Sequence, residues 1–187
     1  MKKYFLIILL MCVVNFANAE LAPMPFKLET FDIDIIRYPH MIQIENKQSV
    51  QIDTHYNFTD REKTYELRYT LFSQTENDIQ NIREAFTIFS IIIIRNIAGF
   101  EVDLSGFSFF RDNDVKREFN GDFGIAGFIQ NPVSDYGNGY NYILLEIFYK
   151  NYTGIVVRTI NSNDVNMYLD MDSEKYDEIY HSFKYKN

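Results

Sequence analysis

The sequence predicts an α+β fold in which a mostly antiparallel, twisted β-sheet is covered by a long central helix and a C-terminal helix. Three observations carry this prediction. Apolar and polar residues alternate over 65–71, the apolar spacing becomes helical over 79–97, and apolar runs at 140–149 and 155–160 form a hairpin. The 14 tyrosines and 17 phenylalanines, with only 8 glycines, are typical of a packed, strand-rich protein.

The sequence of the N-terminal third predicts short strands. Residues 31–35 alternate between apolar side chains and aspartates, which indicates a strand with one buried face. Residues 41–44 and 50–52 are shorter, weaker candidates. In the segment 65–71, Tyr and Leu alternate with Glu66, Arg68 and Thr70, the pattern of a half-buried strand.

A helix is predicted next. Thr75 can cap its start, and Gly99 can end it in a left-handed conformation. The alternative is a strand through residues 86–94, because β-branched side chains favour strands. The apolar stripe of the helix consists of Ile79, Ile82, Phe86, Phe89, Ile93 and Ile97.

The C-terminal half is predicted to be mostly strands. Residues 104–110 form one candidate, and residues 115–119 and 123–130 form a hairpin whose loop sets Phe119 opposite Phe123. The arm 140–149 is apolar on both faces, so we expect it to be covered on both sides. A terminal helix capped by Ser173 is expected to close the chain, with the stripe Tyr176, Ile179, Tyr180 and Phe183.

The stretch FNGDFGIAGFIQ, at 119–130, has three evenly spaced glycines. A phosphate-binding loop needs a helix after its glycines and, in the P-loop, a lysine. Here no lysine follows and the apolar pattern continues as a strand. We therefore interpret Gly124 and Gly127 as a bulge, or as positions where another element packs close to the backbone.

The N-terminus has the three parts of a secretory signal peptide. Lys2 and Lys3 precede an apolar run, and small residues precede Glu20. We predict a signal peptide at 1–19, a single α+β domain at 20–187, and a secreted or periplasmic bacterial protein. An uncleaved N-terminal anchor is the main alternative. Lipidation of Cys12 is less favoured, because the bulky Met11 precedes it.

Composition excludes several classes of partner and chemistry. Removing Lys2 and Lys3 takes the formal charge from −8 to −10, and no basic run remains to bind nucleic acid. Cys12 is the single cysteine, so the mature chain would have neither disulfides nor a catalytic thiol.

No catalytic residue, metal ligand or cofactor is predicted. The three histidines, His40, His55 and His181, lack metal-ligand spacing, and the chain has no HExxH, CxxC or GxSxG motif. The acidic clusters at 112–114 and 170–174 lack the remaining residues of a calcium loop. We expect a non-enzymatic protein. An extracellular hydrolase whose residues come together only in the fold is the alternative.

The loop around 132–142 is the candidate binding segment. It combines glycines with Tyr136, Tyr140 and Tyr142, and such loops make good recognition surfaces. The alternative is a plain connection between strands. The expected partner is an unidentified protein or small ligand in the cell envelope, or a further copy of the chain.

Four segments resemble the PsbP/Mog1-like family of small α/β/α sandwich domains. They are EFNGD at 118–122, GFI at 127–129, the hairpin at 140–160 and DEIYHSFK at 177–184. The resemblance implies an α/β/α sandwich and an accessory, adaptor or envelope-associated role. It carries over no site residues, because that family shares no common site.

Overall fold

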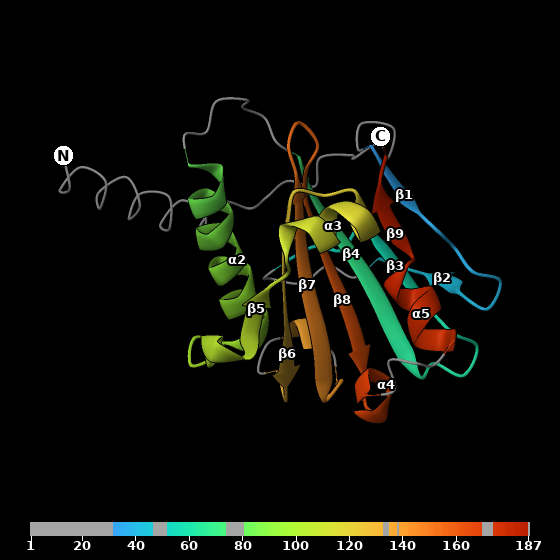
Figure 1. Ribbon diagram of the computed structural model, residues 1–187. Helices are drawn as coiled ribbons and strands as arrows, with labels where there is room; N and C mark the ends of the chain where they lie inside the picture. Colours follow the sequence, from blue (N-terminus) through green and yellow to red (C-terminus); the bar gives the residue numbers. More distant parts are fainter. Residues whose placement is uncertain are drawn as a thin grey trace.

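The computed structural model describes residues 32–46, 52–73, 81–132, 135–137, 139–169 and 174–186. Within these residues a seven-stranded antiparallel sheet has the order β2-β3-β4-β8-β7-β6-β5, and β1 pairs with β9 in a separate ribbon (Figure 1). The strands are β1 (Ile33–Ile35), β2 (Ile42–Ile44), β3 (Tyr56–Thr59), β4 (Tyr65–Ser73), β5 (Phe107–Phe109), β6 (Phe123–Gln130), β7 (Tyr142–Lys150), β8 (Gly154–Ser162) and β9 (Phe183–Tyr185).

Helices lie on both faces of this sheet. Helix α2 packs its isoleucines on one face, here called the α2 face, together with inward residues of β6 and β7. Helices α3 and α5 and the β1–β9 ribbon pack on the opposite face, here called the α5 face (Figure 1). The helices are α2 (Ile82–Ala98), α3 (Asp112–Phe119), α4 (Asn166–Leu169) and α5 (Glu174–Tyr180), with short 3₁₀ turns at Leu104–Gly106 and Asp135–Gly137.

The predicted hairpin at 140–160 is confirmed as β7 and β8, the centre of the sheet. The two strands pair in one antiparallel register, from Ile143 opposite Asn161 to Lys150 opposite Gly154. Side chains of β7 on both faces are buried, as its two apolar faces predicted. The strand predicted at 65–71 is also confirmed, as β4, which pairs with β8 along its whole length.

A helix, α2, occupies Ile82–Ala98, within the segment where the apolar spacing predicted one. Phe86, Ile93 and Ile97 are buried along its stripe. Gly99 follows with φ +98°, and its N–H bonds to the Arg95 carbonyl, so glycine suits this position. The cap predicted at Thr75 lies outside the described residues, as do the candidate strand residues 31, 50 and 51.

The prediction that residues 115–119 form a strand is wrong, because Asp112–Phe119 is helix α3. Two aspartates in its first turn suit the helix dipole, and Val115 and Phe119, four residues apart, are its buried face. Asn120 then adopts the left-handed conformation at φ +53°. Phe123 consequently pairs with Tyr149 of β7 instead of lying opposite Phe119.

The end of the chain also differs from the prediction. Helix α5 ends at Tyr180, and Phe183 belongs to strand β9, which pairs with β1. Phe183 and Tyr185 alternate with the exposed Lys184, a strand pattern too short to stand out from the helical stripe. The cap predicted at Ser173 lies outside the described residues. Of the candidate strand 104–110, only Phe107–Phe109 is a strand.

Close packing at the glycines of β6 is confirmed. A Cβ built on Gly127 would lie 2.1 Å from Cδ1 of Phe107, which pairs with Gly127 across β5 and β6. A Cβ on Gly124 would lie 2.9 Å from the rings of Phe110 and Phe148. The glycines therefore leave room for aromatic rings on both faces of β6.

Candidate functional site

A layer of polar side chains lies on the α2 face of the three adjacent strands β3, β4 and β8. Strand register places Asn57, Arg68 and Thr159 in one row across the sheet. The next row contains Thr59, Glu66 and Asn161. All six are at most 5% exposed, although burying polar groups is costly without partners. This polar layer consists of Asn57, Thr59, Glu66, Arg68, Thr159 and Asn161.

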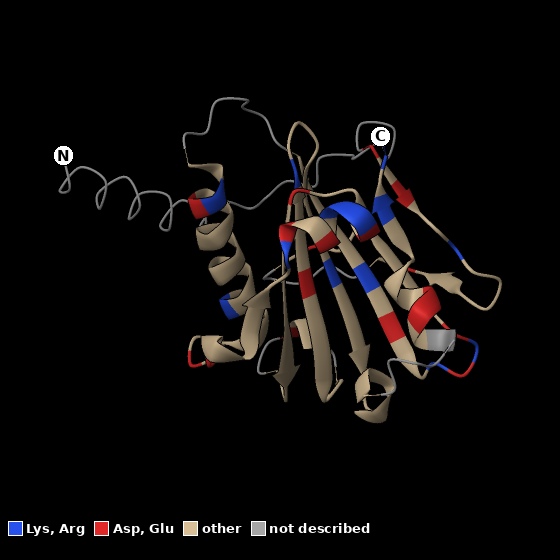
Figure 2. Ribbon diagram, in the orientation of Figure 1, with Lys and Arg blue, Asp and Glu red and all other residues tan. Residues whose placement is uncertain are grey.

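A buried ion pair lies in the middle of the polar layer. Glu66 and Arg68 are two residues apart on β4, so they share a face, and Nε of Arg68 donates to Oε1 of Glu66 at 2.8 Å. Nη1 of Arg68 donates to the carbonyl of Tyr136. The guanidinium carbon lies 4.9 Å from the centre of the Tyr136 ring, a cation–π contact. Figure 2 shows charges of both signs within β4.

Two tyrosines adjoin the polar layer. The Tyr136 hydroxyl lies 3.1 Å from Oγ1 of Thr159, and burial raises the pKa of this phenol despite the nearby positive charge of Arg68. Tyr140 is half-buried, and burial together with the negative charge of Glu66 raises its pKa. Both tyrosines are therefore neutral at pH 7 and act through hydrogen bonds and ring contacts.

The two asparagines of the polar layer have fixed orientations. Nδ2 of Asn161 donates to the carbonyl of Glu66 at 3.0 Å and to Oγ1 of Thr159 at 3.1 Å. Nδ2 of Asn57 donates to the carbonyl of Glu45 at 3.0 Å. Among the described residues, Oδ1 of Asn57, Oδ1 of Asn161 and Nη2 of Arg68 are buried without a hydrogen-bond partner.

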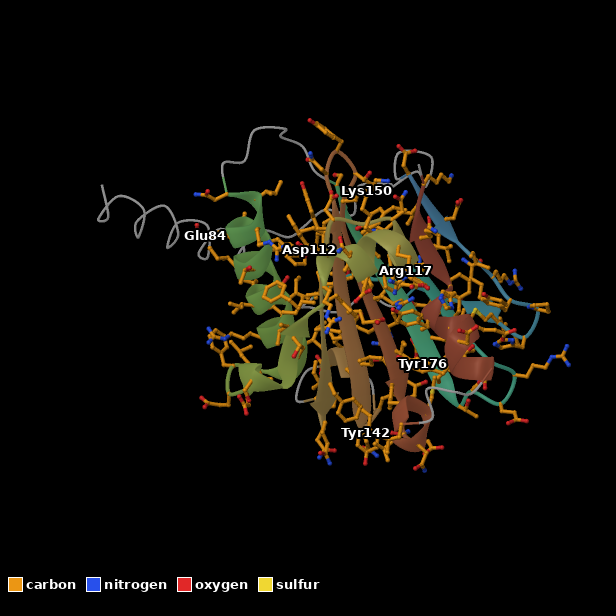
Figure 3. All side chains as sticks on the ribbon, in the orientation of Figure 1. Glu84, Asp112, Arg117, Tyr142, Lys150 and Tyr176 are labelled. Carbon is orange, nitrogen blue, oxygen red and sulfur yellow. The ribbon has the colours of Figure 1, made fainter. Side chains whose placement is uncertain are left out.

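The three tyrosines predicted as a binding segment do not come together. Tyr136 is 2% exposed and packs in the core, so it is not part of an exposed recognition loop. Tyr142 lies on the α5 face of β7, where its ring stacks on Phe128 with centroids 5.7 Å apart. Figure 3 places Tyr142 at the start of β7, near α4. Tyr136 and Tyr140 thus adjoin the polar layer, and Tyr142 does not.

A second buried ion pair lies on the α5 face. Glu146 and Arg158 pair directly across β7 and β8, with Nε and Oε2 2.6 Å apart. Nη1 of Arg158 donates to the carbonyls of Ile179 and Tyr180 at the end of α5. Burial disfavours the charge of Arg158, but Glu146 and Tyr69 together outweigh this effect and raise the pKa of the guanidinium. This pair satisfies helix-end carbonyls, which is a structural role.

The histidines have partners of a structural kind. His40 pairs with Glu178 at 3.1 Å, and Nδ1 of His55 accepts from the Leu71 N–H. His181 lies between Glu118, at 3.4 Å, and Asp177, at 3.2 Å.

The described part of the chain contains no group of three His, Cys, Asp or Glu side chains that could hold a metal ion. Asp112 pairs with Arg83, and Asp114 pairs with Arg117. The side chains of the acidic cluster at 170–174 lie outside the described residues.

Comparisons with known proteins add no relative. No protein-family model matches the chain, and a search of curated proteins finds no similar sequence. No helix within the described ranges is both long enough and apolar enough to span a membrane. The predicted signal peptide, at 1–19, lies outside these ranges.

Sequence reasoning missed the polar layer, although a signal was present. The alternation in β4 indicated one apolar face and one polar face, and polar faces are usually solvated. Thr159 and Asn161 continue the polar pattern in a strand whose hairpin partner is apolar on both faces. Polar residues on β8, which lies next to the fully covered β7, and on β4, the other neighbour of β8, together form a buried polar layer.

Proposed function

We propose that the chain is a secreted or periplasmic binding or accessory protein of the bacterial cell envelope and is not an enzyme. The observation that carries the proposal is the set of three buried, unpartnered atoms in the polar layer, on Asn57, Arg68 and Asn161. A buried donor or acceptor without a partner costs about 1–3 kcal/mol. A ligand that bonds to these atoms removes the cost, so the layer is suited to binding.

The remaining contacts of the layer favour binding over catalysis. The Glu66 carboxylate is paired with Arg68, and the Tyr136 hydroxyl adjoins Thr159. A general base needs a proton-accepting group within reach of a substrate. In this layer the carboxylate and the phenol are held by neighbouring side chains, an arrangement that orients a ligand and moves no proton.

The fold supports a PsbP/Mog1-like assignment as part of this proposal. An antiparallel sheet with helices on both faces is what that resemblance implies. Accessory and envelope-associated roles in that family agree with the signal-like N-terminus, in which small residues precede Glu20.

The binding role is tested by stripping the ligand. The full chain is expressed with a C-terminal tag in a Gram-negative host and purified natively, and half is unfolded in guanidinium and refolded. The native half should melt at a higher temperature because a bound ligand stabilises the folded state. Deproteinised extract of the same cells should restore the melting temperature of the refolded half. Equal melting temperatures without any effect of extract would contradict the binding role.

Export is tested separately by fractionating the same cells. The mature protein should be recovered from the periplasm or the medium, with a mass that corresponds to a chain starting at Glu20. A full-length chain in the cytoplasmic fraction would overturn the proposed location. A full-length chain in the membrane fraction would identify an uncleaved anchor instead.

A further inference from the structure

The three unpartnered atoms of the polar layer define the chemistry of what binds there. This inference rests on the proposed binding function and concerns the class of ligand. Asn57 and Arg68 are paired directly across β3 and β4, and Asn161 is one row away on β8. Paired side chains of neighbouring strands start about 5 Å apart and diagonal ones about 7–8 Å apart, so the amides of Asn57 and Asn161 approach the long Arg68 side chain from the two strands that flank β4. Each residue is at most 1% exposed, so the region around these side chains is enclosed.

Hydrogen bonds decide which atom each asparagine presents to this region. The Nδ2 group of Asn161 has a carbonyl and a hydroxyl as acceptors, and that of Asn57 has the Glu45 carbonyl. Flipping either amide would place two oxygens against each other. The amides therefore offer oxygen acceptors, and the Nη2 group of Arg68 offers N–H donors.

This combination selects against ions. A bare anion would bond to Nη2 of Arg68 but would meet the negative ends of two amide dipoles, on Asn57 and Asn161. A bare cation would suit the two oxygens but would meet the guanidinium charge. A neutral group that donates to the oxygens and accepts from the guanidinium satisfies all three atoms. Hydroxyl groups, primary amides and water have this property.

We propose that the polar layer encloses a small neutral molecule that hydrogen-bonds to Nη2 of Arg68 and to Oδ1 of Asn57 and Asn161. The molecule is a hydroxyl- or amide-bearing solute, or a buried water with the same bonds. A buried water commonly makes about three hydrogen bonds, which is the number offered here. The ring of Tyr136 packs on the guanidinium and keeps this arginine in place.

Arg158 provides an internal control. Its Nη2 atom is also buried without a hydrogen-bond partner, but its guanidinium carbon lies 5.4–5.9 Å from the centres of three aromatic rings. Aromatic faces attract the cation without a ligand. The proposal therefore predicts a bound molecule at Arg68 and none at Arg158.

The test is a high-resolution crystal structure of the natively purified full chain. We expect density within about 3.2 Å of Nη2 of Arg68 and of at least one of the two amide oxygens. Density of one atom, with no small molecule released on denaturation, identifies water. Larger density with a matching mass in the denatured supernatant identifies a solute. The proposal is overturned if the three atoms bond to protein groups instead.

Soaking a crystal in sodium bromide tests the exclusion of anions. Bromide is identified by its anomalous signal, and we expect no peak beside Arg68. A bromide peak there would contradict a neutral ligand. The variant Asn57→Leu should lose or displace the bound density, and Asn141→Leu, at an exposed asparagine, should retain it. Equal density in both variants would remove Asn57 from the site.

The outcomes separate this inference from the proposed function. A bound water with no released solute would satisfy the inference, while equal melting temperatures of native and refolded protein would remove the solute-binding role. A released anion would preserve a binding role and refute the inference. If the refolded protein does not regain the native circular dichroism spectrum, native protein dialysed extensively against buffer takes its place in the melting comparison.

Discussion

The two buried Arg–Glu pairs, one on each face of the sheet, differ in what surrounds the arginine. Arg158 faces the end of α5 and three aromatic rings, so neighbouring elements of the fold surround its charge. Arg68 faces one ring and one carbonyl, and amide oxygens without partners lie beside it. Burial of a charge pair alone therefore does not indicate function. Both arginines have an Nη2 atom without a hydrogen-bond partner, so the two unpartnered amide oxygens of Asn57 and Asn161 on the Arg68 side distinguish the candidate site from the structural pair.

The largest expected effect comes from breaking the structural pair. Arg158→Met leaves Glu146 charged and buried without its partner, which should cost roughly 3–5 kcal/mol of unfolding free energy. Urea denaturation measures the loss, and amide hydrogen exchange should show earlier opening of α5.

The double variant Glu146→Gln/Arg158→Met should recover part of this loss, because no charge remains buried. Arg68→Met is the matched variant on the other face and should loosen the segment around Tyr136 instead of α5. Identical exchange patterns in the two single variants would remove the distinction between the two pairs.

The next effect tests whether Tyr136 belongs to the core or to a surface loop. Tyr136→Ser removes a buried ring from Arg68 and should cost about 3 kcal/mol. Tyr140→Ser, at a half-buried position, should cost less. Thermal melting compares the two variants. An unchanged melting temperature in Tyr136→Ser would show that Tyr136 is not a core residue and would favour the exposed recognition loop.

A smaller effect tests packing on the α2 face away from the polar layer. Gly127→Val places its side chain against the Phe107 ring and should cost about 2 kcal/mol through overpacking. Gly106→Ala, where a Cβ meets nothing within 4 Å, is the control and should change stability little. The double variant Gly127→Val/Phe107→Ala should regain part of the loss if the clash is the cause.

The smallest effect lies at the rim of the α5 face. The hydrogen bond from Arg117, and then His181, lowers the pKa of Glu118. The ionised Glu118 carboxylate therefore stabilises the folded state fully above its unfolded-state pKa of about 4.3. This stabilisation is lost as the pH falls through the lower pKa of the folded state. Glu118→Gln should remove about 0.3 kcal/mol at pH 7.

Unfolding free energies measured between pH 3 and pH 7 should be less pH-dependent in Glu118→Gln than in the parent chain. Glu84→Gln, at an exposed carboxylate of α2, is the control. An unchanged slope in Glu118→Gln would show that the pairs of Glu118 with Arg117 and His181 contribute no measurable stability.

The sequence predicted most of the sheet because its central strands have strong patterns. The β7–β8 hairpin and the alternation in β4 follow from apolar spacing alone. Helix α3 was missed because Val115 and Phe119 fit a strand as well as a helix in a short segment. The acids at its start and the four-residue spacing were the better signals.

The candidate site was harder to predict because its partners are distant in the chain. Arg68 and Tyr136 are 68 residues apart, and Asn161 is 95 residues from the Glu66 carbonyl to which it donates. Alternation identifies which residues share a face of one strand. It does not reveal whether water or other side chains cover that face.

The pairing of β1 with β9 has a consequence for how the chain folds. Ile33 and Tyr185 are partners in that ribbon, so the first and last described strands must meet. Contacts between such distant residues slow folding, because a long loop must close before they form. During synthesis, the ribbon cannot form until the C-terminal residues leave the ribosome. Until then β1 has no partner strand, and the exposed strand edges need protection from aggregation.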